Sequence, residues 1–425
     1  MSNLTLANGR VLDPATGLDR VADLHIAAGR VAGIGAPPEG FVPGRILDAA
    51  GLIVAPGLVD LCARMREPGS EGALRGEMRA ALAGGITGLA CPPDTDPPLD
   101  EPGLVRMLRQ RSREAEGARL YPLGALTSGL AGQALAEMHT LAEVGCVAFA
   151  QTGALPANNG TLLQALRYAR TFDLAIWLRP VDATLVGEGV AGEGAMASRL
   201  GLPGISVAAE TVALHTIFEL QRATGTRVHI CRLSSAQGVA LVRAARREGL
   251  PVTADVSLQH LHLTDADIGY YDTNCRLDPP LRSAQDRAAI RAGLADGTID
   301  AVCSDHTPIS LEDKLLPFGE ALPGASGLEA LLPLVLEWAR ADGIDLLQAL
   351  GAVTRAPAGI LGEDTGTLQP GHKADLVVFD PQARWELRAD AMVSSGHNSP
   401  FVGRPLQGKV RWTLVGGEVR FGDGA

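Results

Sequence analysis

Several side chains that could do chemistry directly follow short apolar runs of the sequence. They are Cys62, Arg64, Gln151, Arg179, Arg232, Asp305 and His306. Cysteine, aspartate and histidine can ligate metals or accept protons, whereas the guanidinium group of arginine holds carboxylates and phosphates. The set therefore mixes residues typical of a metal-assisted hydrolase with residues typical of an anion-binding site.

The runs that precede these residues alternate with helical stretches, a pattern typical of βα units and a parallel sheet. We count eight runs: LIVAPGLVD, ITGLACP, LYPLGAL, CVAFA, LAIWLRP, VHICRLSS, PVTADVSL and DAVCSD. The helical stretches between them include GEMRAALAG, GQALAEMHTLAEV, GTLLQALRYARTF and QGVALVRAARREG. Eight such units predict an α/β protein with a (β/α)8 barrel, whose chemistry lies at the C-terminal ends of the strands. The candidate residues occupy those ends.

The two ends of the chain have a different pattern. SNLTLANGRVLDP, DLHIAAGRVAGIG and RILDAAGLIVAPG near the start, and ADLVVFDP and VRWTLVGGEVRF near the end, combine strand-forming runs with turn residues. We expect residues 1–55 and 366–425 to form one small β-sandwich beside a barrel of residues 56–365.

Composition narrows the functional class. The chain has 425 residues, 46% of them hydrophobic and 20% charged, which predicts a large core and argues against disorder. Its net charge of -11 includes no basic block, which argues against nucleic acid or an anionic membrane as a partner. The sequence shows no signal peptide and no apolar stretch of about 18 residues, and the six cysteines form no CxxC pair. We expect a cytoplasmic protein with buried, reduced thiols.

Longer motifs run along nearly the whole chain. They are VAPGLVDL with MREPG, HIC, NCRLDPPLR, SDHTP, GLEALLPL, GHKADLVVFDP and HNSPFVGRPLQGKV. In this order they resemble the dihydroorotases of the amidohydrolase superfamily. The resemblance implies the same barrel and terminal sandwich, and an ancestral cyclic amide hydrolysis that depends on zinc.

The resemblance also shows which positions held the metal ligands. Family members carry His-x-His after the first strand, an aspartate or carbamylated lysine after the fourth, single histidines after the fifth and sixth, and an aspartate after the eighth. At these positions this chain has Cys62, Arg64, Gln151, Arg179, Arg232 and Asp305. Only Asp305 is retained, and Ile309 replaces the histidine that usually follows it.

These replacements argue against zinc and against hydrolysis. A catalytic zinc needs about three protein ligands, and arginine has no lone pair to offer because it stays protonated. Cys62 and Asp305 alone do not make a site, so we expect no metal cofactor. Asp305 then becomes an ion-pair partner for the arginines, together with Asp60 and Asp182. We interpret His229 and His260 as core or rim histidines, and leave the role of His306 open.

Part of the substrate pocket is also altered. By resemblance, Arg66 and Asn274 match positions that hold the carboxylate and the ring of dihydroorotate. Asp94 stands where the family has an asparagine. An acid there would repel a carboxylate substrate, which argues against substrate binding.

Three functions remain open. The leading one is a catalytically inactive dihydroorotase homologue of pyrimidine biosynthesis, because the resemblance extends to an inactive subunit that assembles with aspartate transcarbamoylase in some bacteria. The second is an anion-binding module in which Arg64, Arg66, Arg179 and Arg232 converge. The third is an active cyclic amide hydrolase with a metal-free site, built on Cys62 and a nearby histidine. A homo-oligomer is compatible with each.

Overall fold

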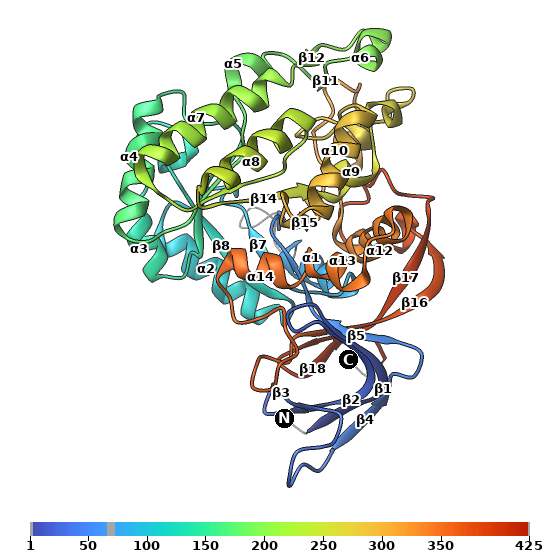
Figure 1. Ribbon diagram of the computed structural model, residues 1–425. Helices are drawn as coiled ribbons and strands as arrows, with labels where there is room; N and C mark the ends of the chain where they lie inside the picture. Colours follow the sequence, from blue (N-terminus) through green and yellow to red (C-terminus); the bar gives the residue numbers. More distant parts are fainter. Residues whose placement is uncertain (1–2, 66–72, 424–425) are drawn as a thin grey trace.

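The computed structural model describes residues 3–65 and 73–423, in which a barrel sits on a smaller β domain (Figure 1). Eight parallel strands form the barrel sheet in the order β15-β14-β13-β10-β9-β8-β7-β6. They are β6 (Leu58–Asp60), β7 (Ile86–Cys91), β8 (Arg119–Ala125), β9 (Ala148–Gln151), β10 (Ile176–Leu178), β13 (Val228–Ile230), β14 (Val252–Ser257) and β15 (Ala301–Cys303). All eight predicted runs contribute a strand, so the predicted (β/α)8 barrel is confirmed.

The barrel closes just beyond the ends of β6 and β15. The backbone N–H of Arg64 donates to the carbonyl of His306 at 2.9 Å, and the N–H of His306 donates to the carbonyl of Cys62 at 3.1 Å. These bonds bring the segment after the first strand beside the segment after the last. The residues in both segments therefore share one site.

Helices surround the barrel (Figure 1). The α-helices are α1 (Ala73–Ala83), α2 (Pro102–Glu114), α3 (Met138–Glu143), α4 (Asn159–Thr171), α5 (Ala183–Val186), α6 (Ala195–Leu200), α7 (Ala208–Thr224), α8 (Ala236–Glu248), α9 (Leu258–His262), α10 (Ala284–Ala295), α11 (Leu311–Lys314), α12 (Leu331–Asp342), α13 (Leu346–Gly351) and α14 (Arg355–Leu361). Short 3-10 helices cover Ser128–Leu130, Asp265–Ile268, Thr273–Cys275, Leu328–Ala330 and Ala389–Ala391, and β11 (Ala191–Gly192) pairs with β12 (Gly204–Ile205). The largest buried side chains include Trp177, Phe149 and Trp338.

The second sheet joins both ends of the chain, as predicted. Its order is β18-β17-β16-β5-β1-β2-β3, with β4 also paired to β1. The strands are β1 (Leu4–Asp13), β2 (Leu18–Ala27), β3 (Arg30–Ile34), β4 (Arg45–Asp48), β5 (Ile53–Pro56), β16 (Leu376–Glu386), β17 (Pro405–Val415) and β18 (Glu418–Phe421). Leu6, Leu24, Val54 and Leu376 form part of its separate apolar core.

Two predicted elements have different bounds. The run LIVAPGLVD is divided at Gly57, so that β5 belongs to the terminal sheet and only β6 enters the barrel. A Cβ at Gly57 would lie 2.1 Å from Thr87 Oγ1, so a close approach requires glycine there. The stretch GQALAEMHTLAEV is helical only from Met138, because Gly132 is left-handed (φ 73°) and Leu135 bridges to Thr127.

The six cysteines are all unpaired thiols, and five of them are buried. This agrees with the expectation of reduced core cysteines. Among the described residues, no helix combines the length and the apolarity needed to cross a membrane.

Candidate functional site

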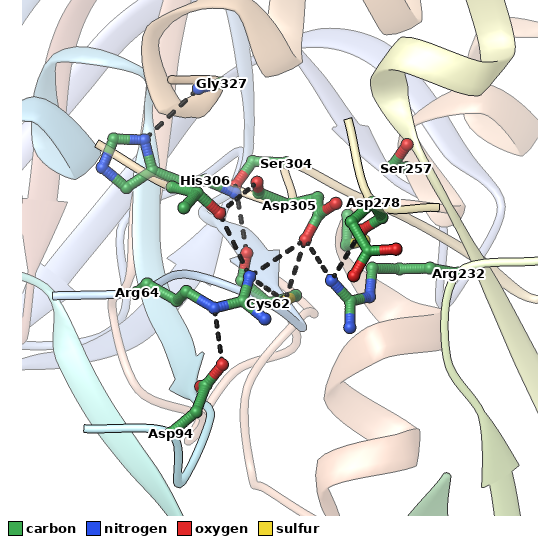
Figure 2. Close-up of polar contacts among 12 residues, drawn as sticks. Cys62, Arg64, Asp94, Arg232, Ser257, Asp278, Ser304, Asp305, His306 and Gly327 are labelled. Carbon is green, nitrogen blue, oxygen red and sulfur yellow. Dashed lines mark hydrogen bonds and ion pairs between the residues drawn. The ribbon is translucent and has the colours of Figure 1, made fainter. Parts of the chain in front are cut away.

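The segments after the barrel strands bring the predicted site residues together (Figure 2). Cys62 and Arg64 follow β6, Arg232 follows β13 and Asp305 follows β15. Arg232 (φ 58°) and Asp305 (φ 46°) both have left-handed backbones. Aspartate tolerates this conformation, whereas arginine rarely adopts it, so the strain lies at Arg232. Such strain persists only where surrounding contacts hold it, and it is concentrated at functional sites.

Asp305 lies at the centre of the contacts. Its Oδ1 accepts from Arg232 Nη1 at 2.8 Å and from Arg64 Nη1 at 3.3 Å, and the Cys62 thiol lies 3.4 Å from the same atom. Arg64 Nη1 also donates to the Thr307 hydroxyl at 3.1 Å. One carboxylate oxygen thus joins residues from three former ligand positions.

Two further aspartates complete the arrangement. Arg64 Nε donates to Asp94 Oδ2 at 2.9 Å. Arg179 forms a two-fold ion pair with both carboxylate oxygens of Asp278, and the backbone carbonyl of Asp278 accepts from Arg232 Nη1 at 3.4 Å. Three arginines and three aspartates therefore balance one another, and we call Arg64, Arg179, Arg232, Asp94, Asp278 and Asp305 the strand-end network.

Burial and charge act in opposite directions on this network. Burial raises the pKa of Asp94, but the charge and hydrogen bond of Arg64 lower it more, so the net shift is downward. Burial also raises the pKa of Asp278, but the charge and hydrogen bonds of Arg179 lower it more, so the net shift is again downward. The Asp278 side chain keeps 45% of its surface exposed, so water screens this pair more than the pair of Arg232 and Asp305, whose side chains are 6% and 12% exposed.

The thiol of Cys62 is kept neutral. Burial raises its pKa well above the ordinary value, and the charge of Arg232 offsets this only in part. A neutral thiol is a weak nucleophile and a poor metal ligand. Among the described residues no histidine ring hydrogen-bonds this thiol, so the cysteine–histidine pair considered from the sequence is not formed.

The space between the former ligand positions is small. A cavity of about 30 Å³ is lined by residues that include Cys62, Gln151, Arg179 and Arg232, and it has room for about one water molecule. Three of the six ligand positions carry guanidinium groups, and the retained carboxylate is already bonded to two of them. These residues do not fit a zinc site of the amidohydrolase type.

Another group of potential ligands lies deeper in the barrel. Ligand atoms of His229, Cys231 and Asp255 lie within 4.8 Å of one another. Both ring nitrogens of His229 are already in hydrogen bonds, to Thr253 at 2.9 Å and to Asp255 at 3.0 Å. Burial raises the pKa of the Cys231 thiol well above its ordinary value. The group forms a hydrogen-bonded layer of the core, in agreement with the interpretation of His229 as a core histidine.

Gln151 occupies its ligand position without joining the strand-end network. Its side-chain oxygen accepts from the Thr127 hydroxyl and its amide donates to the Leu130 carbonyl, each at 2.8 Å. The side chain thus ties the end of β9 to the loop after β8. Its role in the structure is to hold a loop.

Of the three predicted substrate positions, the structure places Asp94 and Asn274, and these two do not line the same cavity. Arg66 lies outside the described residues, and Asn274 belongs to the short turn Thr273–Cys275. A cavity of about 530 Å³ lies beside the strand ends and is lined by Arg64 and Asp94, but Asn274 is not part of its lining. Asp94 lines this cavity as a member of an ion pair with Arg64, so its charge there is matched.

Two expected ion-pair partners have other roles. Asp60 is buried and accepts from the backbone N–H groups of Ser304 at 2.8 Å and Cys62 at 3.3 Å. Asp182 caps α5 by accepting from the N–H of Thr184 at 2.9 Å. The expectation that these two neutralise the arginines was wrong, because the compact backbone turns after the strands engage them first.

Two carboxylates that matter were missed. Asp278 lies in the NCRLDPPLR run. The available sequence signal for its role is an acidic residue directly before a proline in a half-buried segment. Glu77 is fully buried and lies on the apolar face of α1 between Leu74 and Met78, a position at which an acid needs a partner. That partner is His306, whose Nε2 lies 2.9 Å from Glu77 Oε2 while the N–H of Gly327 donates to Nδ1.

His260, the last histidine considered from the sequence, contributes to the packing of the core. His260 bonds to the Ser257 hydroxyl at 2.8 Å and to the Pro280 carbonyl at 3.0 Å. Burial lowers its pKa to about 4. It is neutral near pH 7, in agreement with a satisfied core histidine.

Comparison with known proteins agrees with this architecture. The family described as Dihydro-orotase-like matches residues 51–238, and the Amidohydrolase family matches residues 199–421. Relatives include a "Dihydroorotase-like protein" of Pseudomonas putida, 46% identical over 99% of both chains, and another of Pseudomonas aeruginosa, 45% identical over 98% of this chain and 99% of the relative. A "Dihydroorotase" of Geotalea daltonii is 39% identical over 98% of this chain and 99% of its own length.

Solved structures support the fold alone. The L-hydantoinase (dihydropyrimidinase) from Arthrobacter aurescens has a TM-score of 0.87 at 24% identity, covering 100% of this chain and 97% of its own. The full-length match to relatives above 30% identity is the stronger finding. This chain therefore belongs to the dihydroorotase-like proteins of the amidohydrolase family.

Proposed function

We propose that this protein is a non-catalytic dihydroorotase-like protein of pyrimidine biosynthesis that serves as a scaffold for aspartate transcarbamoylase. The strand-end network is the observation that supports the proposed lack of catalysis. Arg64 and Arg232 both donate to Asp305 Oδ1, the atom that an ancestral metal would need. Without an activated water, the retained aspartate has no proton to move in a hydrolysis.

The structure gives less support to the two alternatives. An anion-binding site needs guanidinium charge that is not already matched, whereas Arg64, Arg179 and Arg232 are each paired with an aspartate. A metal-free hydrolase needs an activated nucleophile. Cys62 is neutral and has no histidine partner among the residues that the structure describes.

The scaffold role rests on the family resemblance and on a contrast within the chain. The barrel and sandwich cores are continuous and buried, while the replacements fall on the ligand positions. A chain without a function would also gather polar residues in its core. A preserved fold with an altered site indicates that the surface has the function, and stable complexes of this kind bury about 1,000 Å² or more.

Co-expression with aspartate transcarbamoylase followed by size-exclusion chromatography tests the proposal. We expect one co-eluting complex at micromolar concentration, and the transcarbamoylase should lose activity or assembly without this partner. A Cys62→Ser variant is the matched control, because it changes the strand-end thiol and no exposed surface, so it should assemble like the wild type. Separate elution, with a transcarbamoylase that is fully active and assembled alone, would contradict the scaffold role.

A further inference from the structure

A second large cavity lies at the opposite end of the barrel, where α2 and β8 approach the terminal sheet (Figure 1). Its volume is about 590 Å³, within the range of about 300–1,000 Å³ for small-molecule sites. Its charged lining comprises Arg109, Arg113, Arg119, Lys373, Arg420, Glu116 and Glu363. Five basic and two acidic side chains thus line one cavity in a chain whose net charge is -11.

Three of the basic residues are matched by carboxylates. Arg119 forms a two-fold pair with Asp375 at 2.8 and 3.0 Å. Lys373 lies 3.5 Å from Glu363, and Arg420 lies 3.2 Å from Glu116. These pairs place both acidic lining residues against cations, so neither presents a free charge to the cavity.

The other two basic residues are not matched. Arg109 and Arg113 lie one turn apart on α2, so their side chains share a face. Arg109 Nη1 donates to the neutral carbonyl of Val144 at 2.7 Å. Arg113 is exposed and has no carboxylate partner among the described residues. Two guanidinium charges therefore remain available at the cavity.

A buried donor also lines this cavity. Tyr121 is only 7% exposed, and its hydroxyl interacts with the side chain of Glu363, which lines the same cavity. Burial raises the pKa of this phenol, and the nearby Glu363 raises it further, so the hydroxyl keeps its proton. This wall of the cavity is therefore internally matched, and the unmatched donors are those of α2.

We propose that this cavity binds a small organic phosphate. Guanidinium groups match the geometry of phosphate oxygens, and Arg109 and Arg113 supply donors from one face of α2. The volume exceeds what inorganic phosphate alone would fill. This site goes beyond the scaffold role and depends neither on catalysis nor on a partner protein.

Calorimetric titration of the full chain with ribose 5-phosphate tests the proposal, with ribose as the uncharged matched probe. We expect saturable binding of ribose 5-phosphate and none of ribose. Arg113→Gln should weaken binding about tenfold, the loss expected for one charge-assisted hydrogen bond. Tyr121→Phe should change it less than about twofold, because that hydroxyl already interacts with Glu363. Both variants should keep the wild-type circular dichroism spectrum.

Arg106→Gln is the control variant. Arg106 is exposed on the same helix but is not part of the cavity lining, so its replacement removes the same charge outside the site. We expect less than a twofold change. No binding of ribose 5-phosphate at millimolar concentration, equal binding of ribose, or equal weakening by Arg106→Gln and Arg113→Gln would each overturn the proposal.

Discussion

The two ends of the barrel differ in whether their arginines have carboxylate partners. At the C-terminal ends of the strands, three arginines are paired with three aspartates. Arg179 and Arg232 line a cavity of about 30 Å³, and the pair of Arg64 and Asp94 lines one of about 530 Å³. At the other end, Arg109 and Arg113 have no carboxylate partners within residues 3–65 and 73–423, and they line a cavity of about 590 Å³. Arginine content alone therefore does not indicate an anion site. What matters is whether the charge is already matched, since a large cavity lies beside arginines at both ends.

This comparison also explains the stability that we expect of the strand ends. An isolated buried charge is costly, but a buried charge with a close partner is tolerated. In the strand-end network, each buried arginine has an aspartate partner. Loss of one member should leave the others buried without a partner, whereas loss of Arg113 removes a charge that water already solvates.

The largest effect is expected from Asp305. Asp305→Ala removes the carboxylate shared by Arg64 and Arg232, and removal of one partner of a buried pair costs about 3–5 kcal/mol. Denaturation in urea would measure this as a lower free energy of unfolding. Asp305→Asn is the matched variant, because asparagine also tolerates the left-handed backbone at this position. It should lose most of the same stability, and an unchanged midpoint for both variants would show that Asp305 is not an ion-pair partner.

A slightly smaller effect is expected from the neighbouring buried pair. Burial raises the pKa of Glu77, but its bond to His306 outweighs this and lowers the pKa from 4.5 to about 2. A lowered carboxylate pKa contributes stability that is full above pH 4.5 and is lost as the pH falls toward 2. Its contribution near neutral pH is about 3 kcal/mol.

Glu77→Gln should therefore lower the free energy of unfolding near pH 7 and flatten its dependence on pH between 4.5 and 2. Unfolding in urea at several pH values would measure both changes. Glu143→Gln is a suitable control, since Glu143 lies on the exposed side of α3 and pairs only loosely with His139, at 3.8 Å. If the free energy of unfolding fell equally steeply between pH 4.5 and 2 in the wild type and in Glu77→Gln, the pairing of Glu77 with His306 would be contradicted.

The smallest effect on stability is expected at the other end of the barrel. Arg113→Gln removes an exposed charge without a carboxylate partner, so the free energy of unfolding should change by less than about 0.5 kcal/mol. Thermal unfolding of this variant beside Asp305→Asn compares the two ends directly. If Arg113→Gln lowered the free energy of unfolding as much as Asp305→Asn, the contrast between matched and unmatched charge would not hold.

The sequence was informative where a pattern repeats. Eight apolar runs with helical spacing predicted the barrel, and the ordered motifs placed Cys62, Arg64, Arg232 and Asp305 at strand ends that the structure brings together. The partners of the arginines were harder to predict, because Asp278 and Asp94 reach the site from loops whose path depends on the whole fold. Asp60 was misassigned for the same reason, because Ser304, whose N–H donates to it at 2.8 Å, lies 244 residues away in the sequence and meets it only in the folded barrel.

Zinc content combined with activity is the measurement that tests the central claim most directly. The purified full chain should contain far less than one zinc per chain by elemental analysis, and it should neither hydrolyse dihydroorotate nor form it from carbamoyl aspartate. The double variant Cys62→His with Arg64→His should be equally inactive, because Arg179 and Arg232 still occupy two ligand positions. About one zinc or more per chain, together with turnover that a chelator abolishes, would contradict the account.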